Sequence, residues 1–397
     1  MALRESMAVT TRDEILDLCR HHGFQRAGIA RAEPTPHADF LAQWLAQGYQ
    51  GDMAWLERAP EFRKDIRLRF PWAKSFIVLA IDYAPELPEK LRQKSALPMI
   101  ARYARGADYH DVYKPRLKKL QDAIKALGAD AMWYQDTGPF LERELAAQAG
   151  LGWVGKNTLL IDPRSGSWKF LALIVTSLDI EPDKPEPDHC GTCTACLDAC
   201  PTKAFPQPYV LDARKCISYL TIEHKGAMDP ALRDGVGNWL FGCDICQEVC
   251  PWNRKAEPTR AEPHEELTGL TLSKVLTSKD DHLLKRLAGT PLERTGSARL
   301  KRNAAIVAGN LRDESLLPSI EQAMRHNEAF VREACYWALA HYGTPAARKV
   351  LARAQRHEED DTLREQIIAA LQGNEPQQTT HTDLLDVQDE PDDQDGP

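Results

Sequence analysis

Eight of the ten cysteines in this 397-residue chain lie between Cys190 and Cys250, and their spacing could support redox chemistry. The first group reads Cys-x2-Cys-x2-Cys-x3-Cys-Pro from Cys190 to Pro201. The second is Cys216 followed by Cys-x2-Cys-x3-Cys-Pro from Cys243 to Pro251. In the bacterial ferredoxin run, three such thiolates hold one 4Fe-4S cube and the cysteine before proline ligates another. The cysteines therefore predict two 4Fe-4S clusters in a ferredoxin-like domain.

Crossed ligation divides the eight cysteines into two complete ligand sets. One set is Cys190, Cys193, Cys196 and Cys250, and the other is Cys200, Cys216, Cys243 and Cys246. A disulfide scaffold is the first alternative, but a cytosolic chain of this size neither needs nor keeps one. Paired zinc knuckles are the second, but they lack the x3-Cys-Pro ending. The outlying Cys19 and Cys335 sit in helical patterns and are expected to be buried apolar fillers.

Two neighbouring clusters form a short electron-transfer chain, so a group that accepts the electrons must lie nearby. Asp136-Thr-Gly-Pro follows an apolar strand and precedes a helix, a place where α/β proteins present catalytic groups. A partly dry carboxyl there has a raised pKa and can donate a proton. The alternative is a turn or cap residue. The glycine-rich segment 150–157 matches neither a dinucleotide fingerprint nor a Walker loop.

Hydrophobic periodicity predicts an α/β layer structure over residues 1–178, ahead of a cysteine domain at 179–262. The expected helices are 11–22, with a capping box at Thr11–Glu14, 38–47, 109–127 and 141–149. The expected strands are 75–83, which reads as covered on both faces, 131–135, 158–161 and 168–180.

Residues 263–374 read as wholly helical, with three similar segments that begin at Arg302, Arg332 and Arg364. These arginines are 30 and 32 residues apart, which predicts a short HEAT-like solenoid that binds a large partner. A plain helical bundle is the alternative. The three basic side chains of Ser297–Arg302 could contact phosphates, or they could simply be solvent-exposed at the end of a helix.

The net charge of -8 arises from residues 375–397, which hold eight acids and no Lys or Arg, so the rest of the chain is balanced. This tail is predicted to be disordered. No apolar run reaches the length of a membrane span, and the N-terminus has no signal-peptide pattern. We therefore expect a cytoplasmic protein, and nothing in the sequence demands more than a monomer.

Several segments together resemble the epoxyqueuosine reductase family over residues 10–372. They are Arg102-Tyr-Ala-Arg-Gly-x-Asp-Tyr-His110, Asp136-Thr-Gly138, Glu144-x5-Gly-Leu-Gly-Trp153, Lys156-Asn157, Cys216-Ile-Ser-Tyr-Leu-Thr221 and Gly242-Cys-Asp-x-Cys-Gln-x-Val-Cys-Pro-Trp-Asn253. The resemblance implies a cobalamin enzyme that reduces the epoxide of epoxyqueuosine to queuosine at the wobble base of tRNA. An external low-potential donor, such as a flavodoxin or a ferredoxin, would supply the electrons.

The resemblance also implies roles for individual residues. Asp136 would protonate the epoxide oxygen as the C–O bond breaks. The segments expected to touch cobalamin contain Arg63, Ala101, Arg102, Asp136, Asn157, Leu160, Leu171, Ser218 and Asp244. An Asp-x-His-x-x-Gly motif is absent, so we expect no histidine on cobalt, which leaves an open face for substrate. Lys301 and Arg302 would hold tRNA phosphates, and Lys225 would lie near the anticodon loop.

Two other functions remain open at this point. A reductive dehalogenase would use the same cofactors on a small organohalide, but the helical repeats and the missing export signal favour a macromolecular cytosolic substrate. A non-enzymatic iron–sulfur electron carrier or a tRNA-binding adaptor would leave residues 1–178 without a role.

Overall fold

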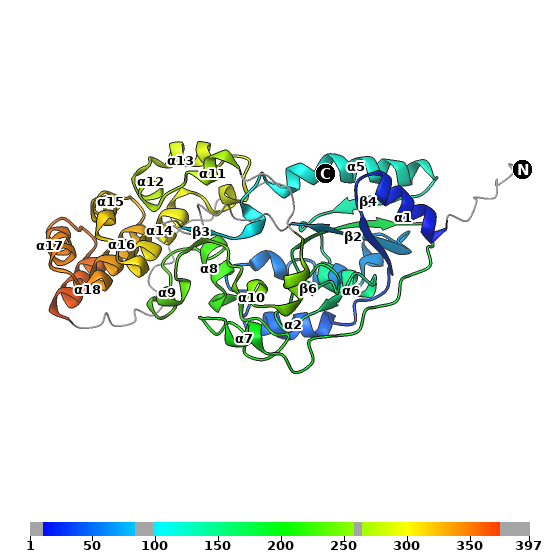
Figure 1. The fold of residues 1–397 in the computed structure, drawn as a ribbon, viewed down its shortest axis with the longest axis horizontal. Helices are drawn as coiled ribbons and strands as arrows, with labels where there is room; N and C mark the ends of the chain where they lie inside the picture. Colours follow the sequence, from blue (N-terminus) through cyan, green and yellow to red (C-terminus); the bar gives the residue numbers. More distant parts are fainter. Residues whose placement is uncertain (1–10, 84–97, 258–263, 374–397) are drawn as a thin grey trace, which may run out of the picture.

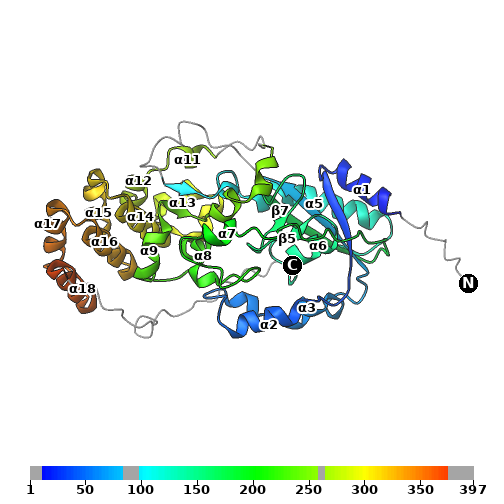
Figure 2. The same cartoon turned by 60° about the horizontal axis from the view of Figure 1, so that its bottom comes forward.

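The computed structural model describes residues 11–83, 98–257 and 264–373, so the predicted disordered tail lies outside the described residues. Figure 1 shows an elongated arrangement, with a sheet and its helices at one end and stacked helices at the other. The cysteine region lies between them, and the turned view in Figure 2 keeps this order.

The main sheet has four strands in the order β1-β2-β7-β4. They are β1 (Arg26–Arg31), β2 (Ser75–Asp82), β7 (Lys169–Thr176) and β4 (Ala131–Tyr134). Every pairing is antiparallel, and Val78 of β2 lies opposite both Gly28 and Leu173. This corrects the α/β expectation to an α+β sheet, because the strands are not joined by parallel crossovers. The short strand β1 was not predicted, since its arginine-flanked sequence has little apolar periodicity.

Both faces of the sheet are covered, as the apolar run 75–83 predicted. On one face, Ile77 packs with Ile15 and Leu117, which come from α1 (Arg12–His21) and α5 (Tyr109–Ala126). On the other face, Val78 packs with Leu145 of α6 (Glu142–Gln148). The predicted capping box at Thr11 and Glu14 is confirmed at the start of α1. The remaining elements of this part are α2 (Ala38–Ala46), α3 (Pro60–Lys64), β5 (Trp153–Val154) and β6 (Leu160–Ile161).

The cysteine region consists of short elements joined by loops. They are α7 (Ala195–Asp198), α8 (Ile217–Ile222), α9 (Pro230–Val236), β8 (Trp239–Phe241) and α10 (Ile245–Glu248). A segment from the sheet domain enters this region, because β3 (Met99–Ile100) pairs in parallel with β8. The two parts are therefore interlocked around residues 99–104.

The C-terminal part is helical, as predicted. Its helices are α11 (Glu265–Thr268), α12 (Leu272–Thr277), α13 (Asp280–Leu287), α14 (Ser297–Leu311), α15 (Leu317–Ala323), α16 (Ala329–Tyr342), α17 (Pro345–Ala354) and α18 (Asp361–Gln372). The three repeated segments fall in α14, α16 and α18. One continuous apolar core joins residues of the cysteine region, such as Leu220 and Phe241, to Ala305 of α14 and Leu339 of α16. No helix in the described part of the chain is long and apolar enough to cross a membrane.

Candidate active site and cysteine clusters

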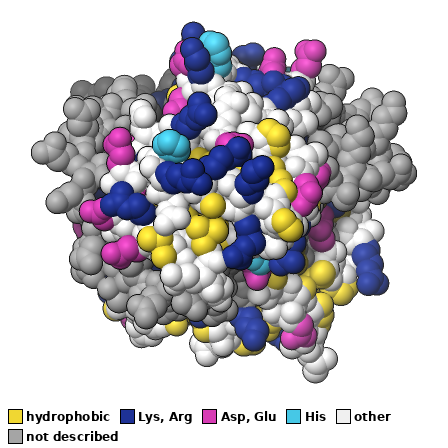
Figure 3. All heavy atoms as spheres, turned by 90° about the vertical axis from the view of Figure 1, so that its left-hand side faces the viewer, with side chains coloured by type: hydrophobic (Ala, Val, Ile, Leu, Met, Phe, Trp, Pro, Cys, Tyr) yellow, Lys and Arg dark blue, Asp and Glu magenta, His cyan; other side chains and the backbone are white. Residues whose placement is uncertain are grey.

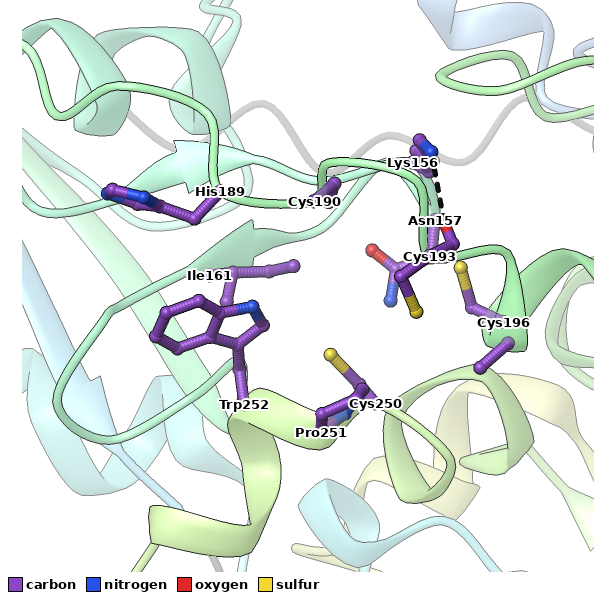
Figure 4. A pocket seen from close by; sticks show the side chains of 11 residues that line it. Lys156, Asn157, Ile161, His189, Cys190, Cys193, Cys196, Cys250, Pro251 and Trp252 are labelled. Carbon is purple, nitrogen blue, oxygen red and sulfur yellow. Dashed lines mark hydrogen bonds between the residues drawn. The ribbon is translucent and has the colours of Figure 1, made fainter.

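The first predicted ligand set lines one cavity. Cys190, Cys193, Cys196 and Cys250 surround it together with Trp252, and the sulfurs of Cys193 and Cys250 point into the shared space (Figure 4). Trp153 donates its indole N–H toward the sulfur of Cys190 at 3.5 Å. Burial and the neighbouring thiols raise the pKa of Cys196 to about 11.

The second predicted set is half-buried, with Cys216 at the start of α8 and Cys246 in α10. The thiol of Cys216 interacts electrostatically with Cys200, and the thiol of Cys246 interacts with Cys200, Cys216 and Cys243. Burial raises the pKa of Cys246 far above its ordinary value, and these neighbouring thiols raise it further. Cys246 also interacts with Cys196 of the first set, so the two sets are adjacent.

Backbone N–H groups supply hydrogen-bond donors near the sulfurs. The backbone N–H of Ala204 donates to the sulfur of Cys200 at 3.3 Å. Burial raises the pKa of Cys216 and Cys250, and backbone N–H groups of Ser218 and Tyr219 near Cys216, and of Trp252 and Asn253 near Cys250, oppose this rise. Donors of this kind stabilise a thiolate and tune the potential of a bound cluster. Within the described residues, no three Cys, His, Asp or Glu side chains could hold a single metal ion. The four cysteines that hold a 4Fe-4S cluster bind different iron atoms, so they lie further apart than the ligands of a single metal ion. The shared cavity and the nearby N–H groups are the features that fit a cluster here.

Asp136 occupies a sharp bend between β4 and α6. Its φ is 59°, in the left-handed region that costs a non-glycine residue conformational energy. The hydroxyl of Tyr109 donates to its Oδ2 atom, and Nε2 of His110 lies 3.8 Å from the same oxygen. The side chain is 47% exposed, so its carboxyl group can reach a molecule that binds from solvent.

Two ionisable neighbours of Asp136 have altered proton affinity. Burial, followed by the charge of Asp136, raises the pKa of Glu142 to about 8. Glu142 Oε1 accepts the backbone N–H of Asp136 at 3.0 Å. Burial lowers the pKa of His110, but hydrogen bonding to Asp108 and the nearby carboxylates outweigh burial, so the pKa is raised overall.

Aromatic rings connect Asp136 to the second cysteine set. Tyr109 stacks on Phe170 with ring centres 4.1 Å apart, and Phe170 in turn contacts Tyr83 at 4.4 Å. Burial raises the pKa of Tyr83, as do the charges of Asp244 and Cys246. The aromatic cluster therefore begins at Asp136 and extends to Tyr83, which lies within range of the charge of Cys246.

Four of the predicted cofactor-contact residues lie around Cys246. The backbone N–H of Arg102 donates to Asp244 Oδ2 at 2.8 Å, and Ala101 N–H donates to Phe241 at 2.9 Å. Asn157 Nδ2 donates to the Cys246 carbonyl at 3.3 Å. Burial raises the pKa of Asp244 to about 6. Gly242 is required here, because a Cβ would lie 2.5 Å from that of Ala101 and its φ is 67°.

The other residues predicted to touch cobalamin lie in separate parts of the fold. Leu160 and Leu171 belong to the apolar cluster on the α6 face of the sheet, and Ser218 lies in α8 directly after the Cys216 segment. Arg63 lies in α3, where it donates to the carbonyl oxygens of Trp55 and Arg58, and burial lowers its pKa.

The prediction that Arg302 and Lys301 contact phosphates is wrong for this structure. Arg302 is fully buried and donates to the carbonyl oxygens of Leu220, His224 and Gly226 at 2.6–2.9 Å. Lys301 is 5% exposed and pairs with Asp280 at 2.5 Å. Neither charged group is available to tRNA, because both are buried and already paired within the protein. Lys225 is exposed, as its predicted role requires.

Sequence reasoning missed Tyr109, Glu142 and Gln135 as site residues. Tyr109 and Glu142 meet Asp136 only because the chain bends back at that residue. Gln135 is 1% exposed, and neither polar atom of its amide has a partner among the described residues. A buried polar residue at the end of an apolar strand was the one signal in the sequence for Gln135.

Comparison with known proteins identifies the family. Three family models match: "Epoxyqueuosine reductase QueG" at residues 63–137, "4Fe-4S double cluster binding domain" at 189–253 and "HEAT repeats" at 274–372. The epoxyqueuosine reductase of Xanthomonas campestris pv. campestris is 40% identical over 340 residues, covering 83% of this chain and 95% of that protein. This chain belongs to the epoxyqueuosine reductase family. It is therefore an oxidoreductase with a double 4Fe-4S cluster domain and HEAT-like repeats.

Other epoxyqueuosine reductases are similar along most of the chain. The Escherichia coli K12 enzyme is 35% identical over 326 residues, covering 80% of this chain and 86% of that protein. A crystal structure of an epoxyqueuosine reductase with an epoxyqueuosine-modified tRNA stem loop has a TM-score of 0.84 and 30% identity, covering 91% of this chain and 98% of that one. The Bacillus subtilis structure, described with its catalytic aspartate loop swung out of the active site, has a TM-score of 0.83 at 30% identity, covering 92% and 99%.

Proposed function

We propose that this chain reduces the epoxide of epoxyqueuosine to queuosine in tRNA, using cobalamin and electrons from two 4Fe-4S clusters. Family membership and a similar structure that holds an epoxyqueuosine-modified stem loop support the substrate. The observation that carries the proposal in this chain is the position of Asp136. Its half-exposed carboxyl group is held by Tyr109, at one end of an aromatic cluster whose other end, Tyr83, lies within range of the charge of Cys246.

The eight cysteines would hold the clusters in the crossed sets predicted above. The common cavity of the first set supports this division, as do the charge effects on Cys246, which are largest from Cys216 and Cys243 of its own set. The clusters would bring single electrons to the active site from a low-potential donor such as a flavodoxin or a ferredoxin. The enzyme is proposed to act as a cytoplasmic monomer.

The residues around Cys246 fit a large polar cofactor. Arg102 Nε is buried and has no hydrogen-bond partner among the described residues, and both polar atoms of Gln135 share this property. Unpaired buried polar atoms are costly, and an amide or phosphate of cobalamin would satisfy them. Arg102, Asn157 and Asp244 would hold the cofactor on the cysteine side, with Ala101 and Ser218 contributing backbone contacts and Leu160, Leu171 and Arg63 lining its outer parts. Bound cobalamin would supply a strongly reducing cobalt centre.

Asp136 would provide the proton that the epoxide oxygen needs as its C–O bond breaks. Without it an alkoxide must leave, which is unfavourable near neutral pH. Tyr109 would fix the orientation of the carboxyl group by donating to Oδ2. The aromatic cluster of Tyr109, Phe170 and Tyr83 would exclude water from the path between the acid and the cysteine region.

Exposed basic side chains lie beside this site, where the tRNA would approach it. Arg294 lies in a 3-10 turn (Pro291–Thr295), over the ring of Trp55 at 5.5 Å, and its charge lowers the pKa of His110. It pairs with Glu223 at 3.0 Å, but unlike Lys301 its side chain is 58% exposed, so a phosphate can still reach it. We therefore assign the nearest phosphate contacts to Arg294 and Lys225 in place of Lys301 and Arg302. A second basic surface covers the end formed by α15–α18 (Figure 3). Part of its charge is neutralised, since Arg353 pairs with Glu321 at 2.7 Å.

Anaerobic reconstitution tests the proposal. The full chain is loaded with iron, sulfide and cobalamin, then incubated with a low-potential reductant and tRNA that carries epoxyqueuosine. Mass spectrometry of the nucleosides should show queuosine in place of epoxyqueuosine. Protein that retains iron and cobalamin but forms no queuosine would contradict the substrate assignment and favour a small-molecule substrate.

A further inference from the structure

The carboxyl groups of Asp136 and Glu142 face each other across the bend that joins β4 to α6. Glu142 Oε1 accepts the backbone N–H of Asp136 at 3.0 Å, which places the two carboxyl groups within reach of each other. Two carboxyl groups can share a hydrogen bond only when one carries a proton. A proton on Glu142 could therefore be shared with Asp136.

The neighbouring groups decide which carboxyl group holds that proton. Asp136 Oδ2 accepts the Tyr109 hydroxyl, and His110, whose pKa is raised, lies 3.8 Å away. Both groups therefore contact the carboxyl group of Asp136. Glu142 is the more buried partner, with a pKa raised to about 8, and the charge of Arg143 opposes this rise. Asp108 and Arg294 act on His110 rather than on Glu142 directly.

We propose that Glu142 stores the proton that Asp136 delivers to the substrate and reprotonates Asp136 within each turnover. This inference rests on the proposed function. Conversion of an epoxide to the parent alkene breaks two C–O bonds and releases the oxygen as water, which consumes two electrons and two protons. The low-potential reductant supplies the electrons through the clusters. Asp136 alone carries one proton at a time, so the second must come from a group in contact with it.

Glu142 is placed to supply that second proton. Its carboxyl group accepts the backbone N–H of Asp136, and its partial exposure lets it regain a proton from water. Glu142 does not itself need to touch the substrate, so it is a positioning and proton-holding residue that acts through Asp136.

Glu142→Gln separates proton storage from a structural role. The amide oxygen still accepts the Asp136 N–H, and the amide N–H still donates to the Asp136 carboxylate, but no proton can be released. We expect kcat to fall about 10²-fold, a typical contribution of general-acid catalysis. The KM for tRNA and the cofactor absorbance spectra should not change. Glu142→Asp should recover part of kcat. Glu144→Gln, two residues along α6 and paired with His37 at 3.3 Å, is the matched control and should stay near wild type.

Two pH-dependent measurements complete the test. The kcat of the wild type should fall as pH rises through about 8, where Glu142 loses its proton, and Glu142→Gln should lack this limb. Independently of activity, infrared difference spectra between about pH 7 and pH 9 should show a protonated-carboxyl band in the full chain that Glu142→Gln abolishes. A Glu142→Gln variant with wild-type kcat and an unchanged alkaline limb, or an unchanged infrared band, would overturn the proposal. If the wild type makes no queuosine but the band behaves as expected, the proposed substrate fails while the shared proton stands.

Discussion

The guanidinium of Arg302 lies 2.6 Å from the backbone carbonyl oxygen of Leu220 and so joins helix α14 to helix α8. The same side chain donates to the carbonyl oxygens of His224 and Gly226. These bonds fix the segment that follows Cys216 against the helical repeats. Burial lowers the pKa of Arg302 to about 9, yet the group remains charged at neutral pH.

Replacement of Arg302 should therefore destabilise the protein rather than weaken tRNA binding specifically. Arg302→Met leaves three buried carbonyl groups without a donor, and each costs about 1–3 kcal/mol. We expect a free-energy loss of at least about 3 kcal/mol, seen as a lower midpoint of anaerobic thermal unfolding. Arg325→Met, at an exposed arginine, is the control. An unchanged midpoint together with a raised KM for tRNA would restore the phosphate-contact role.

The crossed division of the cysteines predicts that two cysteines close in sequence serve different clusters. Cys196→Ala should remove the cluster held with Cys250, whereas Cys200→Ala should remove the one held with Cys216. Each variant should lose about half of the iron. Electron paramagnetic resonance of the reduced proteins should show a different surviving signal in each, and Cys335→Ala, at a buried cysteine outside both sets, should keep all its iron. Identical spectra from Cys196→Ala and Cys200→Ala would refute crossed ligation.

Tyr109 should contribute to turnover by orienting Asp136. Tyr109→Phe removes a hydrogen bond to a carboxylate, which is worth about 1.5–3 kcal/mol. We expect kcat to fall at least about tenfold, with little change in the KM for tRNA. Tyr113→Phe is the matched control, because Tyr113 lies one turn further along α5 and also packs near Phe170. Equal kcat values for the two variants would show that Asp136 does not depend on Tyr109.

Arg294 should contact tRNA directly. Arg294→Glu reverses an exposed charge beside the site, so the KM for tRNA should rise and its dependence on salt should weaken. Lys118→Glu, at an exposed position on α5, provides the control for net charge. Steady-state kinetics at two salt concentrations measures both effects. If both reversals raise KM equally, the effect of Arg294 is one of net charge rather than contact.

Local patterns predicted the parts of this protein that depend on neighbouring residues in sequence. The cysteine spacing predicted the double 4Fe-4S cluster domain, and its division into two ligand sets stays a prediction. The capping box predicted the start of α1, and the repeated segments predicted α14, α16 and α18. The antiparallel sheet could not be predicted, because strand order depends on contacts between distant segments. The burial of Arg302 and the contacts of Tyr109 and Glu142 with Asp136 could not be predicted for the same reason.

All three repeat arginines donate to backbone carbonyl oxygens, so the repeated arginine has a structural role rather than a tRNA-binding one.

The role of Asp136 is tested by comparing Asp136→Asn with the wild type in a single-turnover reaction on epoxyqueuosine-containing tRNA, followed by mass spectrometry of the nucleosides. The wild type should convert epoxyqueuosine to queuosine. Asp136→Asn should bind both cofactors and tRNA normally yet react about 10²–10⁴-fold more slowly, because the epoxide oxygen loses its proton donor. Near wild-type conversion by this variant would remove Asp136 from the mechanism and contradict the central claim.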